Sequence, residues 1–179
     1  MPRYIALLRG INVGGNRSVR MEALRKTVTA AGGTDVETYI QSGNVVLGHA
    51  LRSPAKVAEA LTAAISKACK FDVPVVVRTA AEWDRVIADN PFAGAAPEHL
   101  HVFFLPAAPP ADALDRIDAA AFAPERFVPA GRELYLALPN GIGRSQLVGK
   151  GMRVKALAPA TARNWRTVLR LQAMARGTG

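Results

Sequence analysis

Cysteine is almost absent from this chain, with a single residue, Cys69, among 179. One cysteine excludes an intramolecular disulfide and leaves few ligands for a metal site. Long apolar runs are also absent, because no stretch approaches the roughly 20 residues that a membrane-spanning helix needs. The N-terminus runs into a strand pattern without the features of a signal peptide. These absences predict a cytoplasmic protein with no membrane partner.

Acidic residues are missing from the last quarter of the chain, since Glu133 is the last of them. Residues 1–133 carry 15 Lys and Arg against 14 Asp and Glu, whereas residues 134–179 carry eight Lys and Arg and no acid. Nearly all of the net charge of +9 therefore lies in residues 134–179. A basic region of this kind attracts nucleic acid, phosphorylated ligands or acidic surfaces. The alternative is an arginine-rich composition on a solvated helical face.

The pattern of apolar residues predicts a β-α-β-β-α-β order over residues 2–79, which is typical of an α/β plait. The expected elements are strand 3–9, helix 19–31 capped by Ser18, strands 36–40 and 44–47 joined by the turn Gln41-Ser42-Gly43, a helix opened by Ser53-Pro54, and strand 73–78. Strand 3–9 is apolar on both faces, so we expect both of its faces to be covered.

The second half of the chain predicts a similar alternation of helices and strands. The expected elements are a helix capped by Thr79, strand 100–105, helix 111–121, strands 126–129 and 133–138, and helices 144–157 and 161–175. The predicted fold class is α+β, with two α/β-plait (ferredoxin-like) subdomains, residues 1–80 and 81–179, packed together. Residues 4–11 and 135–142 also match at five of eight positions, which is either chance or an internal duplication.

A glycine-rich loop, Gly10-Ile-Asn-Val-Gly-Gly15, follows the first strand and precedes a helix. Such a loop directs backbone N–H groups at one point and suits an anion. The candidate ligand-binding residues of this segment are Arg9, Asn12, Gly14, Gly15, Arg17 and Ser18. A P-loop would need Lys and then Ser or Thr directly after the second glycine, so we do not expect nucleotide hydrolysis. The alternative is that the glycines only permit a positive φ.

Two further segments carry polar residues suited to a ligand. Gln41 and Asn44 are candidate contacts if their turn lies near the glycine-rich loop. In the last predicted helix, Arg163, Arg166 and Arg170 recur at helical spacing and form a candidate nucleic-acid-binding stripe. Arg163 and Asn164 are also candidate ligand contacts, since a guanidinium and an amide suit a phosphate or a base. The alternative for this helix is that its arginines face water.

Catalytic residues do not emerge from the sequence. The turn at Ser42 lacks the frame of a nucleophile elbow. His99 and His101 share one face of a strand, but the remaining supply of ligands is poor, so we expect no metal. No carboxylate pair is spaced for acid–base work, and no cofactor is evident.

Four segments together resemble a known bacterial family. They are ALLRGINVGG (6–15), TYIQSGNVV (38–46), HVFFL (101–105) and TARNW (161–165). They are similar to the uncharacterised family "domain of unknown function 1697", over essentially the whole chain. The resemblance implies two α/β-plait subdomains and brings no established activity, cofactor or catalytic residue. Many members carry Lys after the double glycine, where this chain has Asn16, and Arg17 is the candidate substitute.

The sequence favours a protein that binds an anionic ligand in the cleft between the two subdomains. The ligand would be a nucleotide-like metabolite or single-stranded nucleic acid. One alternative is an enzyme acting on a phosphorylated or carboxylated small molecule without a metal. Another is a structural or regulatory protein with no small ligand.

Overall fold

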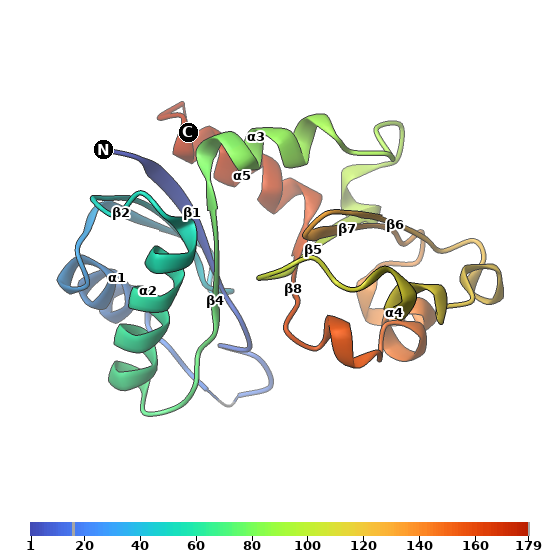
Figure 1. The fold of residues 1–179 in the computed structure, drawn as a ribbon, viewed down its shortest axis with the longest axis horizontal. Helices are drawn as coiled ribbons and strands as arrows, with labels where there is room; N and C mark the ends of the chain where they lie inside the picture. The colour runs from blue at the N-terminus through green and yellow to red at the C-terminus, as the bar shows by residue number, and fades with distance from the viewer. Residues whose placement is uncertain (16, 179) are drawn as a thin grey trace. The chain divides into compact units, whose positions relative to one another are not determined.

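The computed structural model describes residues 1–15 and 17–178 and contains two four-stranded antiparallel sheets with helices (Figure 1). The predicted α+β class with two α/β subdomains is confirmed. Asn16, at the position compared with the P-loop lysine, lies outside the described residues. Residues 1–85 and 170–179 form one compact unit, unit 1, and residues 86–169 form another, unit 2.

The last ten residues belong to unit 1, whereas the sequence-based division placed them in the second subdomain. Contacts to α3 (Ala80–Ala88) explain this assignment. Gln172 Nε2 donates a hydrogen bond to Asp84 Oδ1 at 2.7 Å, and Arg176 Nη2 lies 3.0 Å from the same oxygen.

Unit 1 has the predicted β-α-β-β-α-β order. Its elements are β1 (Arg3–Leu8), α1 (Met21–Ala30), β2 (Gly33–Tyr39), β3 (Asn44–His49), α2 (Pro54–Cys69) and β4 (Val75–Thr79). The strands are arranged in the order β2-β3-β1-β4, and each neighbouring pair is antiparallel. A central β1 therefore has a hydrogen-bonded partner on both sides.

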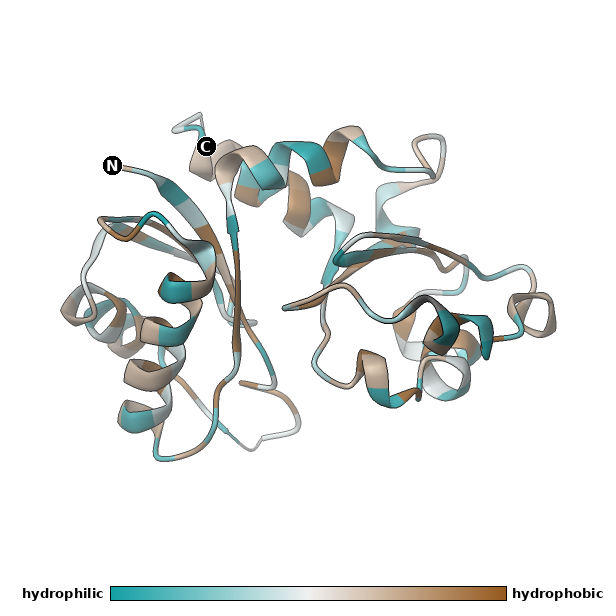
Figure 2. Ribbon diagram, viewed as in Figure 1, coloured by the Kyte–Doolittle hydropathy of each residue, from teal (hydrophilic) through white to brown (hydrophobic). Residues whose placement is uncertain are grey.

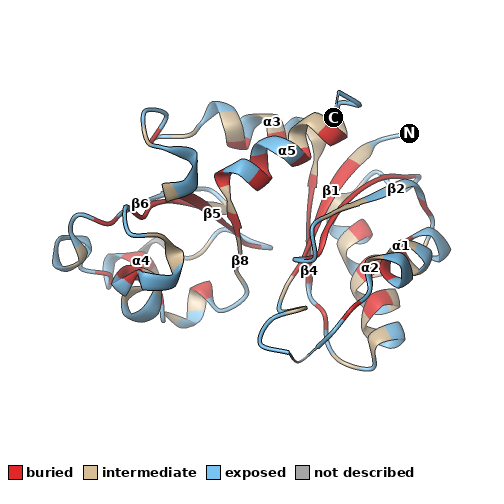
Figure 3. Cartoon of the chain, turned by 180° about the vertical axis from the view of Figure 1, so that it is seen from behind, coloured by how far each residue is buried: buried red, intermediate tan, exposed pale blue. Residues whose placement is uncertain are grey.

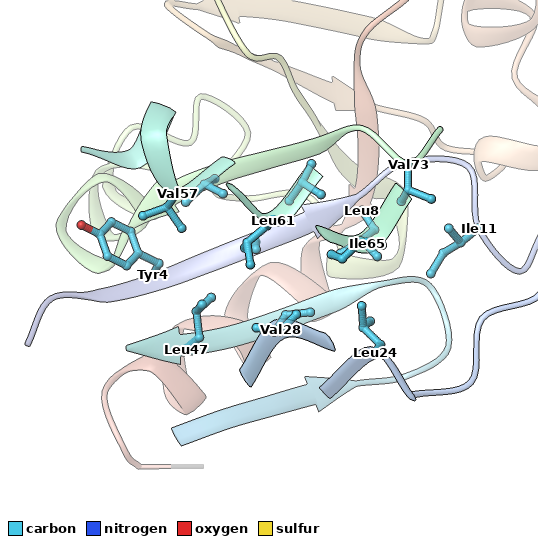
Figure 4. Packing of buried hydrophobic residues seen from close by; sticks show 14 of the residues in the cluster. Tyr4, Leu8, Ile11, Leu24, Val28, Leu47, Val57, Leu61, Ile65 and Val73 are labelled. Carbon is cyan, nitrogen blue, oxygen red and sulfur yellow. The ribbon is translucent and has the colours of Figure 1, made fainter. Parts of the chain in front are cut away.

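The core of unit 1 lies between one face of the sheet and helices α1 and α2. Figure 4 shows Tyr4, Leu8 and Leu47 from the strands packed against Leu24 and Val28 of α1 and Leu61 and Ile65 of α2. The residues of β1 that point to the other face, Ile5 and Leu7, are also buried, and β4 is hydrophobic along most of its length (Figure 2). Both faces of β1 are therefore covered, whereas the loops at the strand ends are exposed (Figure 3).

Helix starts in unit 1 follow local capping signals in two of three cases. Ser53 Oγ accepts a hydrogen bond from Lys56 N at 3.4 Å at the start of α2, and Thr79 Oγ1 accepts one from Glu82 N at 3.1 Å at the start of α3. Both predicted caps are confirmed. The predicted cap Ser18 is wrong, because α1 begins only at Met21 and the side chain of Asn12 holds the preceding segment.

Unit 2 repeats the connectivity of unit 1. Its strands are β5 (Leu100–Phe104), β6 (Arg126–Ala130), β7 (Glu133–Ala137) and β8 (Thr161–Asn164), with helix α4 (Ala111–Asp115) after β5. Helix α5 (Trp165–Ala175) follows β8, and its residues from Arg170 onward belong to unit 1. Short turns of 3-10 helix lie at Pro97–His99, Ala119–Phe122, Ile142–Arg144 and Lys155–Leu157, and a π turn lies at Leu147–Gly151. If the strands of each unit are matched by their order along the chain, β5 to β8 correspond to β1 to β4. The strand order β6-β7-β5-β8 is then the same as the order β2-β3-β1-β4 of the first sheet.

Three predicted helices of the second half are wrong in extent. The helix expected over 111–121 is divided into α4 and a 3-10 turn, and that expected over 144–157 is replaced by short turns. Glycine disfavours helix, and residues 141–151 contain four glycines. The helix expected from Thr161 begins at Trp165, because residues 161–164 pair with β5 as β8.

The sequence match between residues 4–11 and 135–142 does not mark the repeat of the fold. Residues 4–8 lie in β1, whereas residues 135–137 lie in β7, whose counterpart in unit 1 is β3. The true counterpart of β1 is β5. The match is therefore a chance similarity between two apolar strands.

Candidate functional site

Three loops of unit 1 meet at one end of its sheet, and we call them together the loop end. They are residues 9–18 after β1, residues 40–43 between β2 and β3, and residues 70–74 before β4 (Figure 1). Leu8 N donates a hydrogen bond to Gly43 O at 2.8 Å, and Arg9 N donates one to Pro74 O at 3.0 Å. The glycine-rich loop and the Gln41–Gly43 turn are therefore neighbours, as the candidate role of Gln41 required.

Asn12 holds the glycine-rich loop in its shape. Its Oδ1 accepts a hydrogen bond from Val19 N at 2.7 Å, and its Nδ2 donates to Val19 O at 3.0 Å and to Gln41 O at 2.7 Å. Its backbone N–H donates to Arg17 O at 3.1 Å. The amide of this candidate ligand residue is thus used within the protein, where it closes the loop and ties it to the neighbouring turn.

The backbone of the loop adopts an unusual run of positive φ angles. The values are +69° at Gly10, +54° at Asn12, +63° at Gly14, +77° at Gly15 and +56° at Arg17. Gly14, Gly15 and Ser18 are exposed, and within residues 1–15 and 17–178 their backbone N–H groups have no hydrogen-bond partner. Successive N–H groups in turns of this kind form concave sites for anions.

Arg17 places a positive charge beside these N–H groups. Its guanidinium carbon lies 5.2 Å from the centre of the Phe71 ring, a cation–π contact that orients the side chain. A methyl group added at Gly10 would lie 3.5 Å from Arg17 Nη1, so the guanidinium also lies against the start of the loop. In the described part of the chain no carboxylate forms an ion pair with Arg17. Its charge is therefore open to a ligand.

The remaining candidates at the loop end divide into structural and exposed residues. Asn44 is buried, and its Nδ2 donates to Tyr39 O at 3.0 Å and to Ser42 Oγ at 2.9 Å, which closes the hairpin. Gln41 is exposed and Arg9 is half-buried beside the loop. We infer that Asn44 acts as a structural residue, whereas Gln41 and Arg9 keep their candidate roles.

Sequence reasoning missed three residues of the loop end. Phe71 supports Arg17, and the apolar side chains of Val13 and Ile40 are 72% and 51% exposed. Ile40 has a φ of +48°, which is rare for a β-branched residue and stores strain in the turn. No sequence signal pointed to Ile40, which the sequence placed at the end of strand 36–40, whereas β2 ends at Tyr39.

The predicted basic stripe of the last helix does not form. Arg163 lies in β8, where it is buried and its Nη1 donates to Thr161 Oγ1 at 2.8 Å and to Ala162 O at 2.7 Å. Burial lowers the pKa of the Arg163 guanidinium to about 10. Asn164 Oδ1 accepts from Arg166 N at 3.0 Å and caps α5. Arg163 therefore does not share a helical face with Arg166 and Arg170, because β-sheet pairing replaces the first turn of the expected helix.

Arg166 and Arg170 are exposed on α5. Arg166 Nη2 lies 3.1 Å from Glu98 Oε2, so the charge of Arg166 is partly balanced. Two exposed arginines, one of them paired, are a weak basis for binding a nucleic acid backbone, which needs several phosphate contacts.

Other chemistry-bearing residues do not gather into a site. In the described residues, no three His, Cys, Asp or Glu side chains are grouped so that they could hold a metal ion. Burial raises the pKa of the Cys69 thiol, which keeps it protonated and a poor nucleophile. None of the helices in residues 1–15 and 17–178 is long and apolar enough to cross a membrane.

His101 makes the stability of unit 2 dependent on pH. Its Nδ1 is buried and has no hydrogen-bond partner in the described part of the chain. Burial lowers the pKa of His101 below its ordinary value, opposed by a backbone hydrogen bond at His99. The unfolded chain therefore takes up a proton before the folded chain does. The contribution to stability is complete above about pH 6.5 and is lost as the pH falls through the folded pKa.

We expect the free energy of unfolding to fall less steeply between about pH 7 and 5 in His101→Gln than in the wild type. Urea unfolding at several pH values measures this slope. His99→Gln is the matched control, since it removes a histidine from the neighbouring turn and leaves His101 in place. Equal slopes for the wild type and His101→Gln would contradict the prediction.

Comparison with known proteins places the chain in a family. The family model described as "Protein of unknown function (DUF1697)" matches residues 1–135. The chain belongs to this family. The range matched by the DUF1697 model contains the whole loop end, whereas the TARNW segment (161–165) lies beyond it. The suspected resemblance is confirmed for the DUF1697 segments within that range.

The fold of this DUF1697 chain is also found among solved structures. An example is the conserved bacterial protein SP0830 from Streptococcus pneumoniae, with a TM-score of 0.75 and 22% sequence identity, where the match covers 97% of this chain and 98% of that chain. At this identity the likeness shows the fold alone. The comparison with curated proteins finds no match.

Proposed function

We propose that this protein binds the anionic group of a nucleotide-like metabolite, a phosphate or a carboxylate, at the loop end of unit 1. The observation that carries the proposal is the exposed glycine-rich loop, in which the N–H groups of Gly14, Gly15 and Ser18 lack partners in the described chain. Donors of this kind bind anions without needing a metal.

Charge and apolar surface at the loop end favour such a ligand. Residues 9–18, 40–43 and 70–74 contain three cationic residues, Arg9, Arg17 and Lys70, against one acidic residue, Asp72, so their net charge is positive. The exposed side chains of Val13 and Ile40 offer apolar contact to a base or a ring next to the anionic group. The proposal concerns unit 1 by itself, and the expectation of a ligand between the two subdomains stays a prediction.

The alternative of a scaffold without a ligand draws support from Asn12 and Asn44, whose amides bond within the protein. Those bonds shape the loop end but leave the N–H groups of Gly14, Gly15 and Ser18 unused in the described chain. Binding of an anion to these N–H groups would favour the ligand-binding function, and absence of binding would favour a scaffold without a ligand.

The proposal predicts selective effects of inorganic pyrophosphate and of ADP on the amide NMR signals of the loop end. Signals of Gly14, Gly15 and Ser18 should shift on titration, and ADP should bind more tightly if Val13 and Ile40 contact the base. Arg17→Gln should weaken binding about tenfold, because it removes a charged hydrogen-bond donor. Binding should also weaken with added salt.

Arg85→Gln is the matched control for Arg17→Gln. Arg85 is an exposed arginine of unit 1 on α3, so its loss changes the net charge equally. Its affinity for pyrophosphate should stay within about twofold of the wild type, since exposed distant charges are largely screened. An equal loss in both variants, or no shift at the loop end in millimolar pyrophosphate, would reject the proposal.

A further inference from the structure

Unit 2 has an open groove of about 730 Å³ on the side of its helices and turns. One wall is the α4 region, with Asp112, Ala113 and Arg116, and the other is the segment from Arg153 to Pro159. Figure 1 shows this segment, in orange, beside α4. The volume lies within the range of about 300–1,000 Å³ that is typical of small-molecule sites.

Three cationic side chains line the groove, and none of them forms an ion pair within the described residues. Arg116, Arg153 and Lys155 are exposed, and their side chains form no hydrogen bond or ion pair within the described residues. Asp112 is the single acidic residue among the lining residues. No acidic residue follows Glu133 in the sequence, so the wall formed by Arg153 and Lys155 contains no negative side chain. The groove therefore carries a net positive charge.

The floor between these charges is apolar. Val154 is half-buried and packs against the core of unit 2, and its backbone is extended with a φ of −91° and a ψ of 139°. Val154 also lines the groove, together with Ala113 and Pro159, and the exposed residues Arg153 and Lys155 lie on either side of it in the chain.

We propose that this groove binds an amphipathic anion, a small molecule with an apolar body and a carboxylate, sulfonate or phosphate group. The apolar body lies on Val154 and its neighbours, and the anionic group lies between Arg116 on one wall and Arg153 with Lys155 on the other. The groove shares no residue with the loop end of unit 1, so this proposal does not depend on the function proposed for the loop end.

The test uses the fluorescent sulfonate 1-anilinonaphthalene-8-sulfonate with the full chain. Its fluorescence should rise on binding, and Arg153→Gln/Lys155→Gln should weaken its affinity about three- to tenfold, as expected for two exposed charge contacts. Arg116→Gln, on the opposite wall, should weaken it as well. Asp112→Asn should strengthen it, because this change removes the one negative charge of the lining.

Arg144→Gln/Lys150→Gln is the matched control, since both residues are exposed cations of unit 2 that do not line the groove. The uncharged probe N-phenyl-1-naphthylamine should bind the Arg153→Gln/Lys155→Gln variant and the wild type alike. Near-UV circular dichroism confirms that each variant is folded. An affinity for the sulfonate that is unchanged in Arg153→Gln/Lys155→Gln and in Arg116→Gln, or that falls equally in the control, would overturn the proposal.

Discussion

Replacing Glu125 with alanine is expected to lower the free energy of unfolding of unit 2 by about 2–4 kcal/mol. Glu125 is 6% exposed, and its Oε2 accepts hydrogen bonds from Ser145 Oγ at 3.0 Å and from Leu147 N at 2.7 Å. Ser145 Oγ in turn accepts one from Val148 N at 2.9 Å. Alanine would leave the backbone N–H of the buried Leu147 without its acceptor in a place that water does not reach.

Urea unfolding followed through the amide NMR signals of unit 2 measures this change in that unit alone. Glu125→Gln keeps an acceptor oxygen and should therefore lose less stability than Glu125→Ala. Glu59→Ala is the control, because Glu59 is an exposed glutamate of α2, and a surface change of this kind should stay within about 0.5 kcal/mol. If Glu125→Ala also stayed within that range, the role assigned to this carboxylate would be wrong.

The hydrogen bonds of Glu125 are a feature of unit 2 that the sequence did not predict. The segment 144–157 has apolar residues at roughly helical spacing, which predicted a helix. In the structure the segment is instead a series of short turns, and Glu125 binds the start of the π turn at Leu147. A carboxylate that stabilises a turn far along the chain leaves no periodic signal, so neither Glu125 nor the turns could be predicted.

The elements that were predicted well depend on local signals. Strands β1, β3 and β4 of unit 1 contain continuous apolar runs, and the caps Ser53 and Thr79 act on residues three positions away. The strand β8 is different, because the sequence Thr-Ala-Arg-Asn favours neither strand nor helix strongly. Pairing with β5 decides its structure, and this pairing moves Arg163 from an expected exposed stripe into a buried position.

The candidate site was predicted in the same uneven way. The glycine-rich loop and the Gln41 turn are visible in the sequence as clusters of turn residues, and they prove to be neighbours. The role of Asn12 in joining them, and the support that Phe71 gives to Arg17, involve residues distant in sequence. Contacts of this kind follow from the order of the strands in the sheet and not from any local pattern.

Gly43→Ala is expected to destabilise unit 1 by about 2–4 kcal/mol, because two penalties act at this position. Gly43 has a φ of +78°, which side chains other than glycine rarely adopt. A methyl group there would also lie 2.7 Å from Leu8 Cβ and 2.9 Å from Ile11 Cδ1, far inside van der Waals contact. The hairpin turn or the end of β1 would therefore have to move.

Gly14→Ala separates these two penalties. Gly14 has a φ of +63°, and a methyl group there would have no described atom within 4 Å, so only the backbone penalty of about 1 kcal/mol applies. Urea unfolding followed through the amide signals of unit 1 compares the two variants. A loss in Gly43→Ala no larger than that in Gly14→Ala would show that β1 and the turn are not in close contact.

The same pair of variants connects stability with the proposed binding of an anion. Gly43 lies behind the glycine-rich loop, against Leu8 and Ile11, whereas Gly14 lies on its exposed side. If the loop end acts as one site, Gly14→Ala should weaken pyrophosphate binding at a cost in stability of only about 1 kcal/mol, because the added methyl group disfavours the positive φ that orients the N–H groups of the loop. Gly43→Ala should weaken binding only by displacing the turn that Asn12 holds, so its effects on binding and on stability should appear together.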